Sequence, residues 1–125
     1  MTGLTPYFAN KVMDHCLGGV SWTPPSTTYL QLHTGDPGPD GTANVSATST
    51  RKTVTWSASS AGQLTMTSDL TWVTSAKESI SHISLWDASS SGHCLFTDEL
   101  DEAKNVYSGD TLELPTANVQ ILPEA

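Results

Sequence analysis

Positive charge is scarce in this sequence. Its 125 residues include only five Lys and Arg against 13 Asp and Glu, which gives a net charge of −8. The five basic side chains are scattered along the chain and do not gather in one segment. A protein that binds a phosphate backbone needs a cationic surface that displaces counterions. We therefore expect neither nucleic acid nor an anionic membrane surface among its partners.

Cysteine and long apolar runs are rare as well. Cys16 and Cys94 lie far apart with no CxxC spacing, so we expect two reduced, partly buried thiols, with a disulfide as the lesser alternative, and no metal or redox motif. No apolar run approaches the ~20 residues that cross a bilayer, and the N-terminus lacks the basic-then-apolar pattern of a secretory signal. We therefore expect the chain to be made and assembled in the cytoplasm. Its length fits a single domain over residues 1–125.

Hydroxyl side chains, by contrast, are abundant. Ser and Thr supply 34 of the 125 residues, beside nine Gly and seven Pro. That mixture favours short strands joined by turns. Hydrophobic residues make up 37% of the chain, and a domain of this length buries roughly two-thirds of its unfolded surface. We expect a thin core that needs no metal and no disulfide.

One helix is predicted, over about residues 5–17. Thr5 suits the N-cap, Pro6 suits the first helical position, and Gly18-Gly19 ends the pattern. Three apolar residues recur at four-residue spacing: Phe8, Val12 and Cys16. A helix this short is marginal alone, so we expect its apolar stripe to dock on another element, most simply a sheet face.

The remaining chain, about 28–122, predicts strands and turns. Thr28 to His33 alternates as a half-buried strand, and Ile80 to Trp86 gives the strongest strand pattern. Further strands are expected at 53–57, 63–67, 70–74, 94–97, 111–114 and 119–122. The predicted fold is therefore mainly β, an antiparallel β-sandwich or barrel-like domain with one N-terminal α-helix.

No residue pattern demands catalysis or a bound metal. The four histidines show neither HxH nor HExxH spacing, and no GxSxG or Ser-x-x-Lys pattern is present, although acid–base pairs between distant segments stay open. Asp36 to Gly41 predicts an Asp-Pro-Gly turn, with part of a calcium site as the lesser alternative. His33 is expected to hydrogen-bond to backbone, and Cys94 to be a core thiol. We expect no enzyme activity, no catalytic residue, no cofactor and no metal.

Two further features each carry two hypotheses. The run Asp98-Glu99-Leu100-Asp101-Glu102 predicts a solvated loop, with an electrostatic contact to a basic partner as the alternative. The four tryptophans are expected to fill the core or an interface, with a sugar-stacking platform as the alternative. These are Trp22, Trp56, Trp72 and Trp86.

The segment Tyr29 to Gly38 reads YLQLHTGDPG, and Gly41-Thr42-Ala43-Asn44 follows it. This pattern resembles a family of small virion proteins of tailed bacteriophages, especially those of actinobacteria, often labelled tail fibre or minor structural proteins. The helix opening at Leu4 and three later stretches agree in order: 70–72, 81–88 and 108–112. The resemblance spans nearly the whole chain and departs from the family pattern over 92–106.

The resemblance implies a virion structural protein, assembled in the host cytoplasm. The first hypothesis is a capsid decoration protein that binds the outside of the major capsid protein shell and copies of itself, as a homo-oligomer such as a trimer. The alternative is a tail fibre or tail-tip module that contacts the host surface. An enzyme acting on cell-wall glycan is the third and weakest.

For the first two hypotheses, the predicted partner interface combines aromatic residues near the N-terminus with the loop that follows the first long strand. Internal packing of Phe8 and Trp22 and ordinary turn chemistry in the loop are the competing explanations. The candidates are Tyr7, Phe8, Trp22, His33, Asp36, Pro37 and Asp40.

Overall fold

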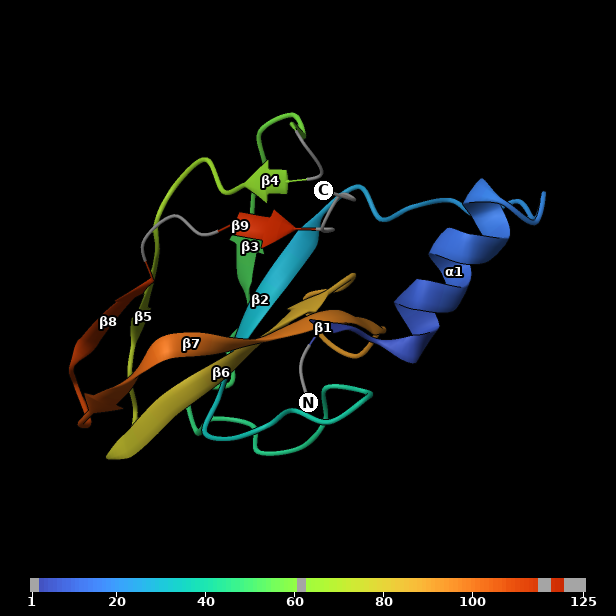
Figure 1. Ribbon diagram of the computed structural model, residues 1–125. Helices are drawn as coiled ribbons and strands as arrows, with labels where there is room; N and C mark the ends of the chain where they lie inside the picture. The colour runs from blue at the N-terminus through green and yellow to red at the C-terminus, as the bar shows by residue number, and fades with distance from the viewer. Residues whose placement is uncertain (1–2, 61–62, 115–117, 121–125) are drawn as a thin grey trace.

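The computed structural model describes residues 3–60, 63–114 and 118–120, and over these residues the fold is mainly β, as predicted (Figure 1). Helix α1 spans Pro6–Cys16. The strands are β1 (Gly3–Leu4), β2 (Thr28–His33), β3 (Lys52–Val54), β4 (Gln63–Thr65), β5 (Leu70–Val73), β6 (Glu78–Trp86), β7 (Cys94–Val106), β8 (Thr111–Leu114) and β9 (Asn118–Gln120).

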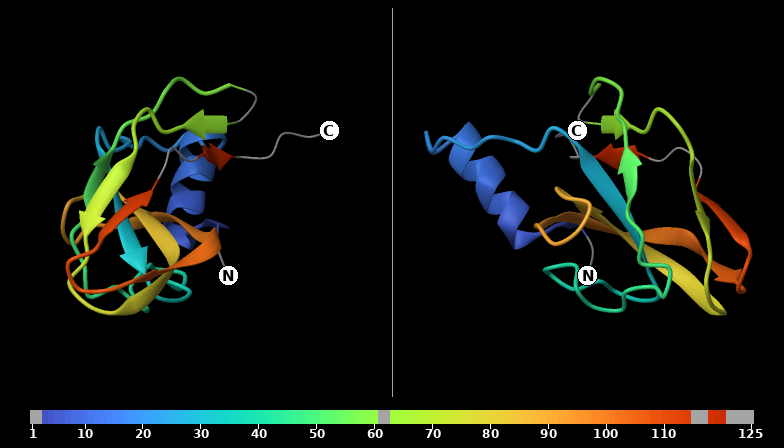
Figure 2. Two further views of the ribbon diagram at one scale, coloured as in Figure 1. Left: turned by 90° about the vertical axis from the view of Figure 1, so that its left-hand side faces the viewer. Right: turned by 180° about the vertical axis from the view of Figure 1, so that it is seen from behind.

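The strands form one five-stranded sheet and two ribbons. The sheet has the order β1-β7-β6-β2-β3, and β5 pairs with β8 while β4 pairs with β9. Every pairing is antiparallel. Figure 2 shows the ribbons lying over one face of the sheet, which gives a sandwich-like arrangement. The predicted antiparallel fold with one N-terminal helix is confirmed.

The hydrophobic core lies between the sheet and the β5–β8 ribbon. Trp72 of β5 is its largest fully buried side chain, and its indole N–H donates to the Thr50 carbonyl oxygen at 2.9 Å. Apolar residues from both layers surround it: Leu30, Leu32, Val54, Met66, Leu70, Ile80, Val106, Leu112 and Leu114. Each large side chain buried this way contributes roughly 1.5–3 kcal/mol to folding, so a thin core suffices.

Strands β2 and β8 have the predicted bounds, but β7 does not. The acidic run 98–102, expected to be a solvated loop, belongs to this strand, which continues to Val106. Residues 104–106 pair with 78–80 of β6, and the register shifts between Ile80 and His82, where β7 carries the extra residues. The loop prediction was wrong because Asp98 and Glu99 pair with β6 and pairing resumes at residue 104, so the strand continues through the unpaired residues between them.

Helix α1 has nearly the predicted bounds but not the predicted packing. The Thr5 hydroxyl caps it by accepting a hydrogen bond from the Phe8 N–H at 3.2 Å. No residue of α1 is buried, however, and the helix leaves the sheet at an angle (Figure 2). Cys16, expected to be partly buried, is exposed, whereas Cys94 is buried, and both thiols are free. The helix stands beside the sheet because only its first residues are anchored there.

Candidate functional site

The start of the helix is fixed to strand β7. Leu4 of β1 pairs with Phe96, and the Thr5 N–H donates to the Leu95 carbonyl oxygen at 3.0 Å. The Thr5 hydroxyl also donates to the Cys94 carbonyl oxygen at 2.7 Å. One buried Thr side chain therefore caps the helix and ties it to the sheet, and everything after Pro6 extends from this anchor.

We call residues 6–25 the arm: it comprises α1 and the segment that returns along it to the sheet. The helix ends at Cys16, and Gly18 and Gly19 follow it, with a positive φ of 72° at Gly19. Trp22 of the returning segment packs on the helix, with its ring 6.0 Å from Phe8 and 6.3 Å from His15 between ring centroids. The arm is thus held together by aromatic contacts of its own residues and by hydrogen bonds such as that from the Val20 N–H to the Asp14 carbonyl oxygen at 3.0 Å.

An apolar cleft of about 370 Å³ lies between the arm and the sheet. The helix lines one wall of the cleft and the end of the sheet lines the other, so the cleft is continuous with the open end of the sandwich. Trp56 and Leu85, which pack against the core, also line it. The other lining residues are Phe8, Val12, His15, Cys16, Trp22, Pro24, Pro25, Thr28, Leu64, Leu95 and Phe96. An opening walled almost wholly by apolar side chains is suited to binding an apolar segment.

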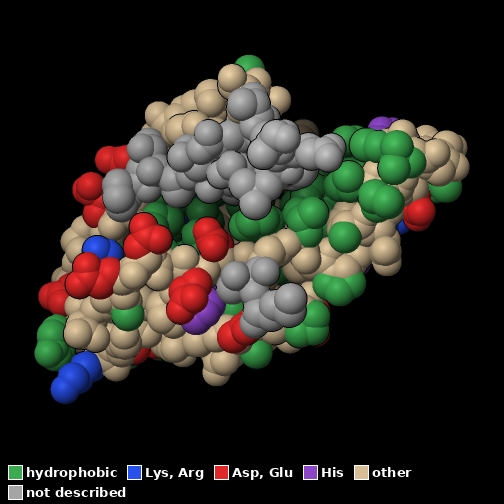
Figure 3. Space-filling view, in the orientation of Figure 1, with side chains coloured by type: hydrophobic (Ala, Val, Ile, Leu, Met, Phe, Trp, Pro, Cys, Tyr) green, Lys and Arg blue, Asp and Glu red, His purple; other side chains and the backbone are tan. Residues whose placement is uncertain are grey.

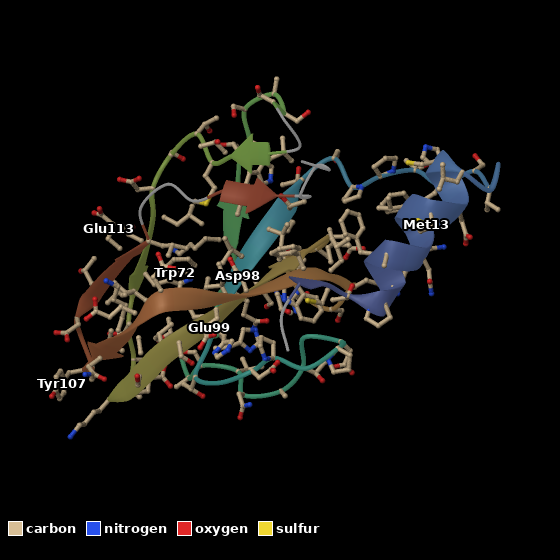
Figure 4. The ribbon with its side chains drawn as sticks, in the orientation of Figure 1. Met13, Trp72, Asp98, Glu99, Tyr107 and Glu113 are labelled. Atoms are coloured by element: carbon tan, nitrogen blue, oxygen red, sulfur yellow. The ribbon has the colours of Figure 1, made fainter. Side chains whose placement is uncertain are left out.

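Hydrophobic side chains gather at the arm end of the visible face in Figure 3, and acidic side chains gather toward the other end. Figure 4 places Met13 on α1, with Tyr107 and Glu113 at the opposite end of the molecule. Asp98 and Glu99 lie on β7 between these ends. Burial and the neighbouring carboxylates raise the pKa of Asp98. The molecule therefore has an apolar end and an acidic end.

The loop after β2 folds back over the outer face of the sheet. It is held by backbone hydrogen bonds from Ser46 to Leu32 (3.1 Å) and from Thr34 to Asn44 (2.8 Å). The Asp36 carboxylate accepts from the Gly38 N–H at 2.9 Å, which is the side-chain-to-backbone turn that the sequence predicted. Asp40 likewise accepts from Thr42.

The buried side chain of His33 connects this loop to the sheet. Its Nδ1 lies 2.9 Å from the Ala43 carbonyl oxygen, and its Nε2 lies 2.6 Å from the Ser84 hydroxyl. The Trp86 indole N–H donates to the same hydroxyl at 2.7 Å. Because a carbonyl oxygen only accepts, Nδ1 carries the proton, and Ser84 donates to Nε2. Burial lowers the pKa of His33, which favours this neutral form.

The Ser84 and His33 pair has the contact distance of a nucleophile and its base, but not the access. His33 is 0% exposed and Ser84 is 1% exposed, so no substrate reaches them. Cys94 is also buried, and this burial raises the pKa of its thiol to about 11. It is the core thiol that the sequence predicted. These polar groups therefore support the loop and the sheet.

The seven predicted interface residues separate into three groups. Phe8 and Trp22 line the cleft. Tyr7 instead lines a separate hollow that Asp40 also borders, and its ring stacks on His93 at 3.9 Å between centroids. Asp36 and Asp40 lie in the loop turns, Asp36 half-buried and Asp40 exposed. His33 and Pro37 are fully buried, so neither side chain can contact a partner in this conformation.

Sequence reasoning missed the sheet wall of the cleft. Leu85 and Phe96 sit opposite one another on β6 and β7, and Leu95 occupies the register shift between Leu85 and Trp86. In sequence these residues look like ordinary core positions. One signal in the sequence could have indicated them: consecutive apolar residues at 94–96, together with an N-terminal helix whose apolar stripe needs a surface to contact.

Among the described residues, no group of three His, Cys, Asp or Glu side chains is arranged to hold a metal ion.

In the part of the chain that the structure describes, no helix is long and apolar enough to cross a membrane. The family model of the podophage GP4 fiber I protein gp80 matches residues 3–122. The chain therefore belongs to this family of bacteriophage structural proteins, which makes it a virion component. A search of curated proteins found no match.

Proposed function

We propose that this chain is a module of the phage tail fibre apparatus that attaches to the virion through its arm and cleft. The observation that carries the proposal is the fibre-family match over residues 3–122. The role is structural and needs no cofactor. The actinobacterial source implied by the sequence resemblance stays a prediction.

The distribution of apolar surface supports an attachment role for the arm. A cleft of about 370 Å³ with apolar walls fits one or two large apolar side chains of another virion protein. Such a contact buries the half-covered rings of Phe8 and Trp22 together with Leu85 and Phe96. The arm end is then turned toward the particle.

The opposite end supports an outward-facing role. Toward this end, the exposed part of β7 carries Glu99, Asp101 and Glu102, and β8 adds Glu113. Like charges at this density keep the surface hydrated and oppose association with other copies of the particle. In the fibre proposal this end faces the medium and the host surface.

The capsid decoration hypothesis remains the second candidate, because an apolar attachment surface and an acidic exterior serve a head protein equally well. In that case the partners are the major capsid protein and copies of this chain. The two candidates differ in copy number and position, since a shell offers hundreds of equivalent sites and a tail offers few.

The deciding experiment is cryo-electron microscopy of purified virions with quantification of this chain against the major capsid protein. The fibre proposal expects a small copy number and density at the tail. Hundreds of copies on the outer shell would overturn it in favour of decoration. A variant phage that lacks the protein should keep intact heads and lose adsorption to its host.

A further inference from the structure

Helix α1 carries two adjacent rows of apolar side chains. Residues four positions apart stack along one face of a helix, and the neighbouring row is offset by one residue. The inner row, Phe8, Val12 and Cys16, lines the cleft. The outer row is Ala9, Met13 and the C-cap residue Leu17. Together the two rows make the apolar part of the helix wider than the cleft covers.

The large side chains of the outer row are not covered by their own chain. Met13 is 57% exposed and Leu17 is 77% exposed, and Val20, just beyond the helix, is 54% exposed. A soluble chain rarely leaves three large apolar side chains together on one short element without a partner.

The outer row is complementary to itself. In an antiparallel pair of α1 helices related by a two-fold axis at Met13, Ala9 of each copy lies opposite Leu17 of the other. A small side chain then faces a large one on both sides of the axis, which lets the helices approach to about 8–10 Å between their axes. Because of the two-fold axis, the Ala9–Leu17 contact occurs twice in the dimer.

Charge points to the same partner. The first 27 positions contain one basic residue, Lys11, and one acidic residue, Asp14, so their net charge is zero. The whole net charge of −8 therefore lies after the arm. Neither Lys11 nor Asp14 belongs to the inner or the outer row, so pairing two arms removes no charged group from those rows. Approach of two copies through the acidic body, in contrast, brings like charges together.

We propose that two copies of this chain associate through the outer rows of α1, antiparallel about a two-fold axis, with Val20 at the rim of the interface. The inner row stays directed at the cleft, so the dimer leaves the attachment surface open. This interface does not depend on whether the chain sits on the tail or on the head.

The test is sedimentation velocity of the purified full chain at about 100 μM, compared with a doubly charged variant of the outer row. The wild type should be a dimer, and Met13→Glu with Leu17→Glu should weaken association at least tenfold, to a monomer. The matched control is Val45→Glu with Val73→Glu, which adds the same two charges at exposed apolar positions away from the arm and should remain a dimer. Circular dichroism checks that each variant is folded.

Two additional measurements keep the proposal open to refutation. If the Glu variant fails to fold, Met13→Gln with Leu17→Gln should give the same loss of dimer. Raising NaCl from 0.05 to 0.5 M should strengthen the dimer, because salt screens the repulsion between two chains of charge −8. A wild type that stays monomeric at high salt would overturn the proposal, as would a control that dissociates equally. The virion copy number would be unaffected by either outcome, so the proposed function is judged separately.

Discussion

The arm and the loop after β2 are built on opposite principles. The arm contains the one α-helix among the described residues, yet none of its helical residues is buried. The loop over residues 34–44 has almost no regular structure, yet His33 at its base and Pro37 within it are fully buried. Of these two segments, the one with regular backbone hydrogen bonding thus has the weaker tertiary packing, and the irregular one has the tighter packing.

The difference comes from where each segment finds its hydrogen-bond partners. The helix satisfies its backbone internally, so it can stand away from the sheet. The loop cannot, and it obtains partners from Asp36, Asn44 and His33, which hold it against the sheet. Substitutions should therefore affect the body and the loop strongly and the arm weakly.

The largest effect is expected in the hydrophobic core of the body. Trp72→Ala removes the largest fully buried side chain and its hydrogen bond to Thr50. The expected cost is about 3–5 kcal/mol of unfolding free energy, enough to leave a thin-cored domain largely unfolded. Urea denaturation followed by circular dichroism measures it. A loss below 1 kcal/mol would show that the core does not centre on this residue.

A matched glycine pair compares loop and arm directly. Gly41 and Gly19 have nearly the same positive φ, 75° and 72°. A Cβ at Gly41 would lie 2.5 Å from the Cys94 sulfur, whereas one at Gly19 would meet nothing within 4 Å. Gly41→Ala should therefore cost about 2–5 kcal/mol, strain plus overpacking, and Gly19→Ala only about 1 kcal/mol. Equal losses in thermal denaturation would contradict the comparison.

The loop should also weaken in acid through His33. Burial lowers the pKa of His33 below its ordinary value of 6.5, so the unfolded chain binds a proton more readily than the folded one. Stability is therefore full above pH 6.5 and falls as the pH drops below it, with a slope of at most about 1.4 kcal/mol per pH unit. Urea midpoints at pH 7.5, 6.0 and 5.0 measure this dependence.

Two histidine variants assign the pH effect. His33→Asn should reduce the slope between pH 7.5 and 5.0, because the titrating group is removed. His15→Asn, on the arm, should leave the slope unchanged. Loss of the slope in the arm variant instead would place the titration outside the loop.

The smallest effect is expected on the arm. Cys16 is exposed and Cys94 is buried, with a pKa raised to about 11. A disulfide reagent at pH 8 should label one thiol in the native protein and two after unfolding, and labelling of Cys16 should hardly change the melting temperature. Rapid labelling of both thiols would mean that the body opens as readily as the arm.

Local patterns predicted the elements well. Alternation gave β2 its observed bounds of Thr28–His33, and the cap at Thr5 located the start of α1 to within a residue. The charged run 98–102 was wrongly predicted as a loop, because strand propensity describes a half-buried surface. Here Asp98 and Glu99 pair with β6, and pairing resumes at Lys104 beyond the register shift. Sequence pattern reports local preference and not the partner that overrides it.

The candidate site was predicted only in part, for a related reason. Phe8 and Trp22 stood out as aromatic residues near the N-terminus, and both line the cleft. Leu85 and Phe96 did not, because a cleft wall and a core face have the same alternation of apolar residues. His33 and Pro37 looked like a surface loop, since nothing local in the sequence says that the loop folds back over the sheet.

The anchor at Thr5 has a consequence for the order of events during synthesis. Its hydrogen bonds reach Cys94 and Leu95, about 90 positions later in the chain. At ribosomal rates of about 5–20 residues per second, the first residues wait on the order of 5–20 s before their binding strand exists. Throughout that interval the amphipathic helix has no β7 to anchor it, so its apolar side chains stay exposed on the nascent chain.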